Sequence, residues 1–144
     1  MSDNKLRPMT EDDLRRIEAA LGKPLPQAFR NVMKNFPQNL IDAAVMTDNM
    51  GNEFIDSMMI SPDAELIAAR ITDPWPGWPE NLLLVGENGC GEEYSVDISD
   101  ERCPVYESGP HNDGMAEGPD EEGYFEQIAD DLEGWVRSLA SRVE

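Results

Sequence analysis

The chain has 144 residues, and this length is typical of one domain that buries its own hydrophobic core. Apolar residues make up 40% of the sequence, a share that excludes an intrinsically disordered chain. Thirty acidic residues face 11 basic ones, and the resulting net charge of −19 excludes partners that are bound through their phosphates, namely nucleic acid and anionic membrane surfaces.

The cysteines and the N-terminus bear on where the protein is found. Cys90 and Cys103 are too few for a disulfide framework, and their spacing matches no zinc site. We therefore expect two reduced thiols near strand ends. The polar N-terminus and the lack of a long apolar run predict neither a signal peptide nor a membrane span, and hence a cytoplasmic protein.

The negative charge is distributed unevenly along the sequence. Residues 1–45 carry seven basic and six acidic side chains, a net charge of +1. Residues 46–144 carry four basic and 24 acidic side chains, a net charge of −20. Such a surface would steer a basic partner towards it, although solubilising charge or adaptation to salt would produce the same excess.

Two helices joined by a short turn are expected near the N-terminus. Thr10 is a good N-cap, acidic residues follow it in the first turn, and Gly22 ends the first helix. Pro26 occupies the first position of the second helix, and Pro37 ends that helix. The buried faces of the two helices are predicted to consist of Leu14, Ile17, Leu21, Phe29, Val32, Met33 and Phe36.

The middle of the chain predicts a small antiparallel sheet with one inserted helix. A short helix over residues 40–46 and a loop over 47–52 lead into it. Ser61 as N-cap and Pro62 as first residue begin the inserted helix, which runs to about Thr72. Strands are predicted over residues 54–60, 82–85, 94–98 and 104–107. In the third of these strands apolar and polar residues alternate, which predicts a half-buried strand.

A loop rich in glycine, proline and acidic residues is expected over residues 108–123. The last helix is predicted to begin near Asp120 or Glu121 and to cover the sheet. Its apolar stripe would consist of Phe125, Ile128, Leu132, Trp135, Val136 and Leu139. No internal repeat or linker divides the chain, so we predict one α+β domain over residues 1–144, with an N-terminal helical hairpin and a C-terminal helix packed on the sheet.

Few residues could support catalysis or bind a metal. Cys90 and His111 are a possible nucleophile and base, but the glutamates near Cys90 would raise the pKa of its thiol and oppose its activation. His111, Asp113, Glu117 and Asp120 could bind calcium weakly, but their spacing differs from that of an EF-hand loop. We therefore predict that the protein is not an enzyme and has no catalytic residues, dedicated metal site or cofactor.

Several short motifs occur in an order typical of one family. They are Ile17-Glu18, Leu21-Gly22, Leu25-Pro26, Phe29-Arg30, Met33, residues 91–98, Pro104-Val105-Tyr106, His111-Asn112-Asp113 and residues 124–128. In these motifs the chain resembles the SUKH superfamily, which includes fungal regulators of cell-wall synthesis and many bacterial immunity proteins. Residues 35–37 depart from the Asn-Gly-Gly of many members, and the resemblance is weak over residues 38–60, which indicates a divergent branch. The resemblance also implies that residues 124–128 start the last helix.

The resemblance implies a protein-binding function. Bacterial SUKH proteins commonly neutralise a cognate toxin, often a nuclease or a deaminase, by binding it directly. The acidity of this chain agrees with a basic toxin domain as the partner, and we expect the protein itself to be a monomer or a weak homodimer. The alternative is a regulatory or scaffolding module of the cell-wall-assembly-regulator type.

We place the expected binding face on the sheet and the loop over residues 108–123, and not on the near-neutral N-terminal helices. The acidic residues gathered there exceed what solubility requires. Trp75 and Trp78 lie in a proline-rich connection and either cap the core or present an aromatic anchor to a partner. The predicted contact residues are Trp78, Glu92, Glu93, Asp113, Glu117, Asp120, Glu121 and Glu122.

Overall fold

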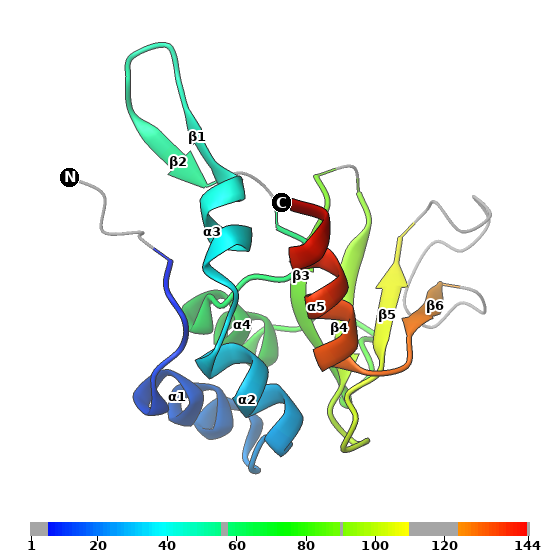
Figure 1. Ribbon diagram of the computed structural model, residues 1–144. Helices are drawn as coiled ribbons and strands as arrows, with labels where there is room; N and C mark the ends of the chain where they lie inside the picture. The colour runs from blue at the N-terminus through cyan, green and yellow to red at the C-terminus, as the bar shows by residue number, and fades with distance from the viewer. Residues whose placement is uncertain (1–5, 56–57, 90, 110–123, 144) are drawn as a thin grey trace.

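The computed structural model describes residues 6–55, 58–89, 91–109 and 124–143 (Figure 1). Helices and strands are combined as the sequence predicts, in an α+β fold with a helix at each end and antiparallel strands between. The helices are α1 (Glu11–Leu21), α2 (Gln27–Lys34), α3 (Gln38–Ala44), α4 (Ala64–Thr72) and α5 (Leu132–Val143). The strands are β1 (Val45–Thr47), β2 (Glu53–Ile55), β3 (Leu82–Glu87), β4 (Glu93–Asp97), β5 (Val105–Ser108) and β6 (Phe125–Ala129).

The signals that delimit α1 act as predicted. The Thr10 hydroxyl accepts from the Asp13 backbone N–H at 3.2 Å, and the Asp13 carboxylate accepts from the Thr10 N–H at 2.9 Å. This reciprocal capping box satisfies two amides at the helix start. Gly22 ends the helix in the left-handed conformation, with φ at +78°. At α2 the prediction was wrong by one residue, because Pro26 is the N-cap and not the first helical residue.

Arg30 joins α2 to α1 through ion pairs with two acidic residues of α1. Its Nη1 lies 2.9 Å from Glu18 Oε2, and its Nη2 contacts the carboxylate of Glu11. The same oxygen of Glu18 accepts from the Leu25 backbone N–H at 2.8 Å. Because residues 1–45 carry seven basic and six acidic side chains, the excess negative charge of the chain lies on the elements that follow.

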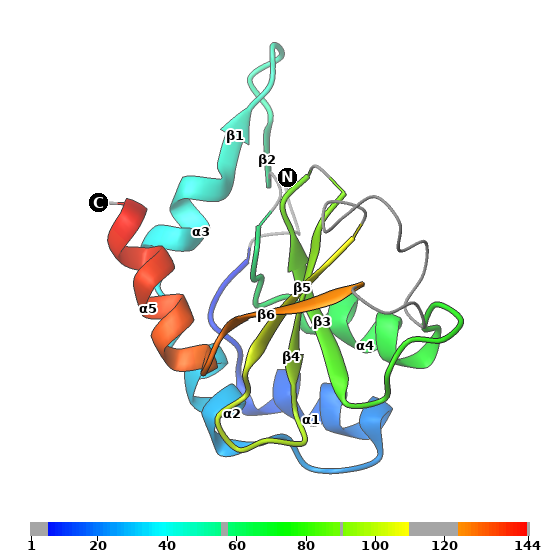
Figure 2. The same ribbon diagram turned by 90° about the vertical axis from the view of Figure 1, so that its right-hand side faces the viewer.

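The core lies between the helices and one face of the four-stranded sheet, whose strand order is β3-β4-β5-β6. In Figure 1 the helices lie on one side of this sheet, and Figure 2 looks onto its opposite face. Leu83, Val96 and Val105 are directly paired across three strands, so they share the core face. Buried residues of the core include Leu14, Ile17, Phe29, Met33, Ile67, Leu83, Val96, Val105, Leu132 and Val136.

The connection from β2 to α4 differs from the predicted strand over residues 54–60. β2 covers Glu53–Ile55 and pairs with the three residues of β1, and residues 56 and 57 lie outside the described part of the chain. The segment from Met58 to Ser61 then runs along the free side of β3 as irregular backbone and makes two hydrogen bonds to it. At the start of α4 the cap is Asp63, whose carboxylate accepts from the Leu66 N–H at 3.1 Å, and not Ser61.

The predicted course of the last helix was wrong over its first part. Residues Phe125–Ala129 form β6, which pairs antiparallel with β5, and α5 begins only at Leu132. The predicted apolar stripe is therefore divided between β6 and α5. Hydrogen bonds to the neighbouring strand β5 override the helical spacing of Phe125 and Ile128. Asp120 and Glu121, where we expected the helix to begin, lie outside the described residues.

The short helix over residues 40–46 and the half-buried strand over 94–98 need smaller corrections. The helix begins earlier, at Gln38, and ends at Ala44, so that the next three residues can pair as β1. In β4 the polar face is covered as well, since Ser95 is as buried as its apolar neighbours. The strand is central in the sheet, between β3 and β5, and on the same face Glu93 pairs with Arg70 of α4.

Candidate protein-binding surfaces

Two of the predicted contact residues, Glu92 and Glu93, lie at the start of β4. Glu93 is largely buried, and its Oε2 lies 3.4 Å from Nη1 of Arg70 on α4. Glu92 accepts a hydrogen bond of 2.7 Å from the Asn88 side chain across the turn between β3 and β4. Both carboxylates thus have partners within the chain, and the guanidinium of Arg70 offsets part of the charge of Glu93.

The two tryptophans of the proline-rich connection have different surroundings. Trp78 donates from its indole N–H to the Leu82 carbonyl at 2.8 Å and packs edge-on against Phe125, with ring centroids 5.3 Å apart. Trp75 is 46% exposed and covers Arg70, whose guanidinium carbon lies 4.6 Å from the ring centroid. Trp75 is the more exposed of the two rings and is better placed to serve as an anchor for a partner, although the predicted contact residues include Trp78 and not Trp75.

The other predicted contact residues lie outside the described part of the chain. They are Asp113, Glu117, Asp120, Glu121 and Glu122, and the same holds for Cys90 and His111. A binding role for the loop over residues 108–123 thus stays a prediction.

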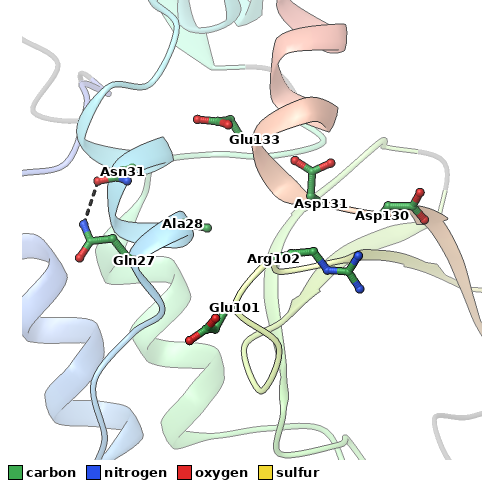
Figure 3. Close-up of a pocket in the computed structure, with 8 residues that line it drawn as sticks. All are labelled: Gln27, Ala28, Asn31, Glu101, Arg102, Asp130, Asp131 and Glu133. Carbon is green, nitrogen blue, oxygen red and sulfur yellow. Dashed lines mark hydrogen bonds between the residues drawn. The ribbon is translucent and has the colours of Figure 1, made fainter.

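The structure also forms an acidic depression that the sequence analysis missed (Figure 3). It has a volume of about 450 Å³ and lies between α2, the turn after β4 and the start of α5. The α2 side is neutral, and the other sides carry four carboxylates and one guanidinium. The lining residues are Gln27, Ala28, Asn31, Glu101, Arg102, Asp130, Asp131 and Glu133.

Backbone hydrogen bonds bring the two acidic segments of the depression together. The Leu132 N–H donates to the Arg102 carbonyl at 3.1 Å, which ties the turn after β4 to the start of α5. Asp131 caps α5 by accepting from the Gly134 N–H at 2.9 Å. A carboxylate at this end of a helix is stabilised by the helix dipole. Asp130 and Glu101 are exposed at the rim, where they are available to a partner.

The cations near the depression offset only part of this negative charge. Arg102 is turned towards Asp100, with 3.6 Å between Nη2 and Oδ2, and Glu133 pairs with Arg137 at 3.5 Å along α5. Both pairs are solvent-exposed and therefore weak. The signal that could have revealed the site is the pair of aspartates, residues 130 and 131, which is typical of a helix start. We missed it because we extended the helix through them.

The cysteine that the structure describes, Cys103, is unsuited to nucleophilic chemistry. It lies in the core, and burial raises the pKa of its thiol to about 11. At pH 8 only about one thiol in a thousand would be ionised. We expect the Cys90→Ser variant to resist maleimide labelling when folded and to label fully in urea, as followed by mass spectrometry. Rapid stoichiometric labelling of the folded variant would show that Cys103 is accessible.

The described residues offer neither a metal site nor a membrane span. No group of three or more His, Cys, Asp or Glu side chains in this part of the chain is placed to hold a metal ion. No helix among the same residues is long and apolar enough to cross a membrane. The surface features that the described residues do show are carboxylates around an open depression and exposed apolar side chains.

The fold and these surfaces define an acidic α+β domain. Comparison with known families is more specific: residues 8–138 match the SMI1 / KNR4 family (SUKH-1), and the chain belongs to this family. The resemblance found in the short motifs is thereby confirmed. No curated protein and no solved structure matches the chain. Membership in SUKH is compatible with immunity and with cell-wall-assembly roles.

Proposed function

We propose that the chain is an immunity-type protein, which binds a basic, nucleic-acid-targeting toxin and keeps it from its substrate. The observation that carries the proposal is the acidic depression, where two segments separated by 28 residues in sequence (102 to 130) present four carboxylates around one hollow. The family match supports it at a coarser level, because immunity is one of the roles compatible with SUKH.

The chemistry of the expected partner explains why such a surface would inhibit it. A protein that acts on nucleic acid binds phosphate through clustered lysines and arginines. Carboxylates compete for the same cations, so an acidic protein seated on this cluster excludes the nucleic acid. The net charge of −19 adds long-range attraction, which raises the association rate before any contact forms.

The test is direct binding to the product of the neighbouring gene, since an immunity gene usually lies beside its toxin gene. We expect a one-to-one complex, loss of the toxin's activity at equal concentrations, and an association rate constant that falls steeply as salt is raised. Calorimetry, an activity assay and surface plasmon resonance measure these three quantities.

The alternative role, a regulatory or scaffolding module, predicts a different outcome. The neighbouring product would then neither bind nor be inhibited, and a pull-down from the native host would recover several unrelated partners. Recovery of one basic toxin domain supports the immunity role instead.

A further inference from the structure

The hairpin of β1 and β2 projects from the end of α3, away from the main sheet (Figures 1 and 2). Its two strands pair only with each other among the described residues. Met46 and Phe54 are direct cross-strand partners and therefore lie on one face of the hairpin. They are 43% and 49% exposed, and Met50 in the connecting turn is 84% exposed. Residues 45–55 are called the arm below.

The turn of the arm is held in one conformation by Asp48. Its Oδ1 accepts from the backbone N–H groups of Met50 at 2.8 Å and Asn52 at 2.9 Å. Two backbone hydrogen bonds close the same turn, and Gly51 supplies the left-handed residue with φ at +84°. Met50 is thus presented by an ordered turn, so little conformational entropy is lost when a partner covers it.

Exposed apolar side chains on so small a hairpin need a physical reason. A two-stranded hairpin is marginally stable in water by itself, and Met46 and Phe54 gain little from burial in this position. Large apolar side chains grouped on a protruding element are typical of interaction sites. Methionine is suited to this use, because its flexible thioether fits pockets of irregular shape.

The charge around the arm determines the kind of partner. The sequence has six acidic residues and no Lys or Arg between Lys34 and Arg70. Asp48 and Glu53 belong to the arm itself: Asp48 lies in its turn, and Glu53, the partner of Thr47, lies on the face opposite Met46 and Phe54. A second copy would bring a further net charge of −19 to the contact and is disfavoured. An apolar groove bordered by lysines or arginines would instead be complementary to the arm both in its apolar surface and in its charge.

We propose that the arm docks in an apolar groove with a basic rim on a protein partner, with Met46, Phe54 and Met50 as the buried contacts. This surface is separate from the acidic depression, which lies at the start of α5, whereas the arm extends from the end of α3 (Figure 1). The inference does not depend on what binds at the depression. It adds an apolar contact surface to the charged one at the depression.

A synthetic amphipathic peptide of lysine and leucine is the probe, since it presents an apolar stripe flanked by positive charge. Methyl NMR of the methionines follows its binding to the full chain. We expect the methyl signals of Met46 and Met50 to shift, and those of the buried Met9 and Met33 to stay in place. The Met46→Ser/Phe54→Ser double variant should bind the peptide about tenfold more weakly.

Matched controls separate this surface from the rest of the molecule. Leu66→Ser removes an equally exposed apolar side chain from α4 and should leave peptide binding unchanged. Glu101→Gln/Asp130→Asn neutralises the rim of the depression and should leave the Met46 and Met50 shifts intact, whether or not the proposed function holds. The Met46 and Met50 shifts are measured on the unaltered chain, so this readout does not depend on whether a variant folds.

Three results would overturn the inference. The Met46 and Met50 methyl signals could fail to move, or a glutamate–leucine peptide could move them as strongly, which would remove the charge requirement. The third is self-association: if these two signals shift with protein concentration and sedimentation shows a dimer, the occupant of the arm is a second copy.

Discussion

Gly86→Ala is expected to lower the free energy of unfolding by about 3 kcal/mol. A β-carbon at this position of β3 would lie 2.3 Å from the carbonyl oxygens of both Met58 and Met59, which are backbone atoms. The Met58 oxygen accepts from the Glu87 N–H, and the Ser61 N–H donates to Val85, each at 2.9 Å. Relief of the clash requires this segment to move away from β3, which breaks or weakens both hydrogen bonds.

The matched control is Gly22→Ala, at the end of α1. No atom lies within 4 Å of the added carbon there, but φ is +78°, so the cost is backbone strain alone, about 1 kcal/mol. Urea denaturation followed by tryptophan fluorescence measures both variants. If Gly86→Ala costs no more than Gly22→Ala, the segment along β3 is free to adjust and the close approach is not a constraint.

The parts of the fold that were predictable from the sequence depend on local signals. Thr10 and Gly22 delimit α1 through groups within one helical turn, and the start of α2 at Pro26 was missed by one residue only. The alternation in β4 likewise identified the strand, although not the burial of Ser95. Local chemistry was sufficient wherever the stabilising partner was near in sequence.

β6 shows why the remainder could not be predicted. Phe125 and Ile128 have the spacing of a helix face, and nothing within a few residues opposes that interpretation. The strand forms because β5 offers a hydrogen-bonding edge: Ser108 pairs with Phe125 and Tyr106 with Gln127. Such pairing joins residues 17 or more positions apart, which periodicity does not reveal.

The same limit applies to the candidate surfaces. Net acidity after residue 45 was evident from counting, but the depression depends on Leu132 pairing with Arg102 and so on where α5 begins. Of the predicted contacts that the structure describes, Glu92 and Glu93 have partners inside the chain. The acidic residues that stand at an open hollow, Glu101 and Asp130, become neighbours only through the fold.

Reversing charge at the depression, with Glu101→Lys and Asp130→Lys, is expected to lower the association rate constant for a basic toxin partner about 10- to 100-fold at low salt. Both residues are exposed, so the folded state should be nearly unaffected. Asp131 is left in place, because its carboxylate caps α5. The loss should shrink as salt is raised, because screening removes the attraction that the variant lacks. Surface plasmon resonance over a salt series measures it.

The matched control changes the net charge by the same amount on a part of the surface away from the depression. Glu65→Lys and Glu80→Lys reverse two exposed acidic residues, on α4 and in the connection before β3. Long-range steering depends on the overall field, so this variant also loses some association rate. A carboxylate that contacts the partner contributes to the dissociation rate as well. If only the depression variant dissociates faster, the interface lies at the depression. If both variants change the association and dissociation rates equally, the acidic residues act only by long-range attraction and the contact lies elsewhere.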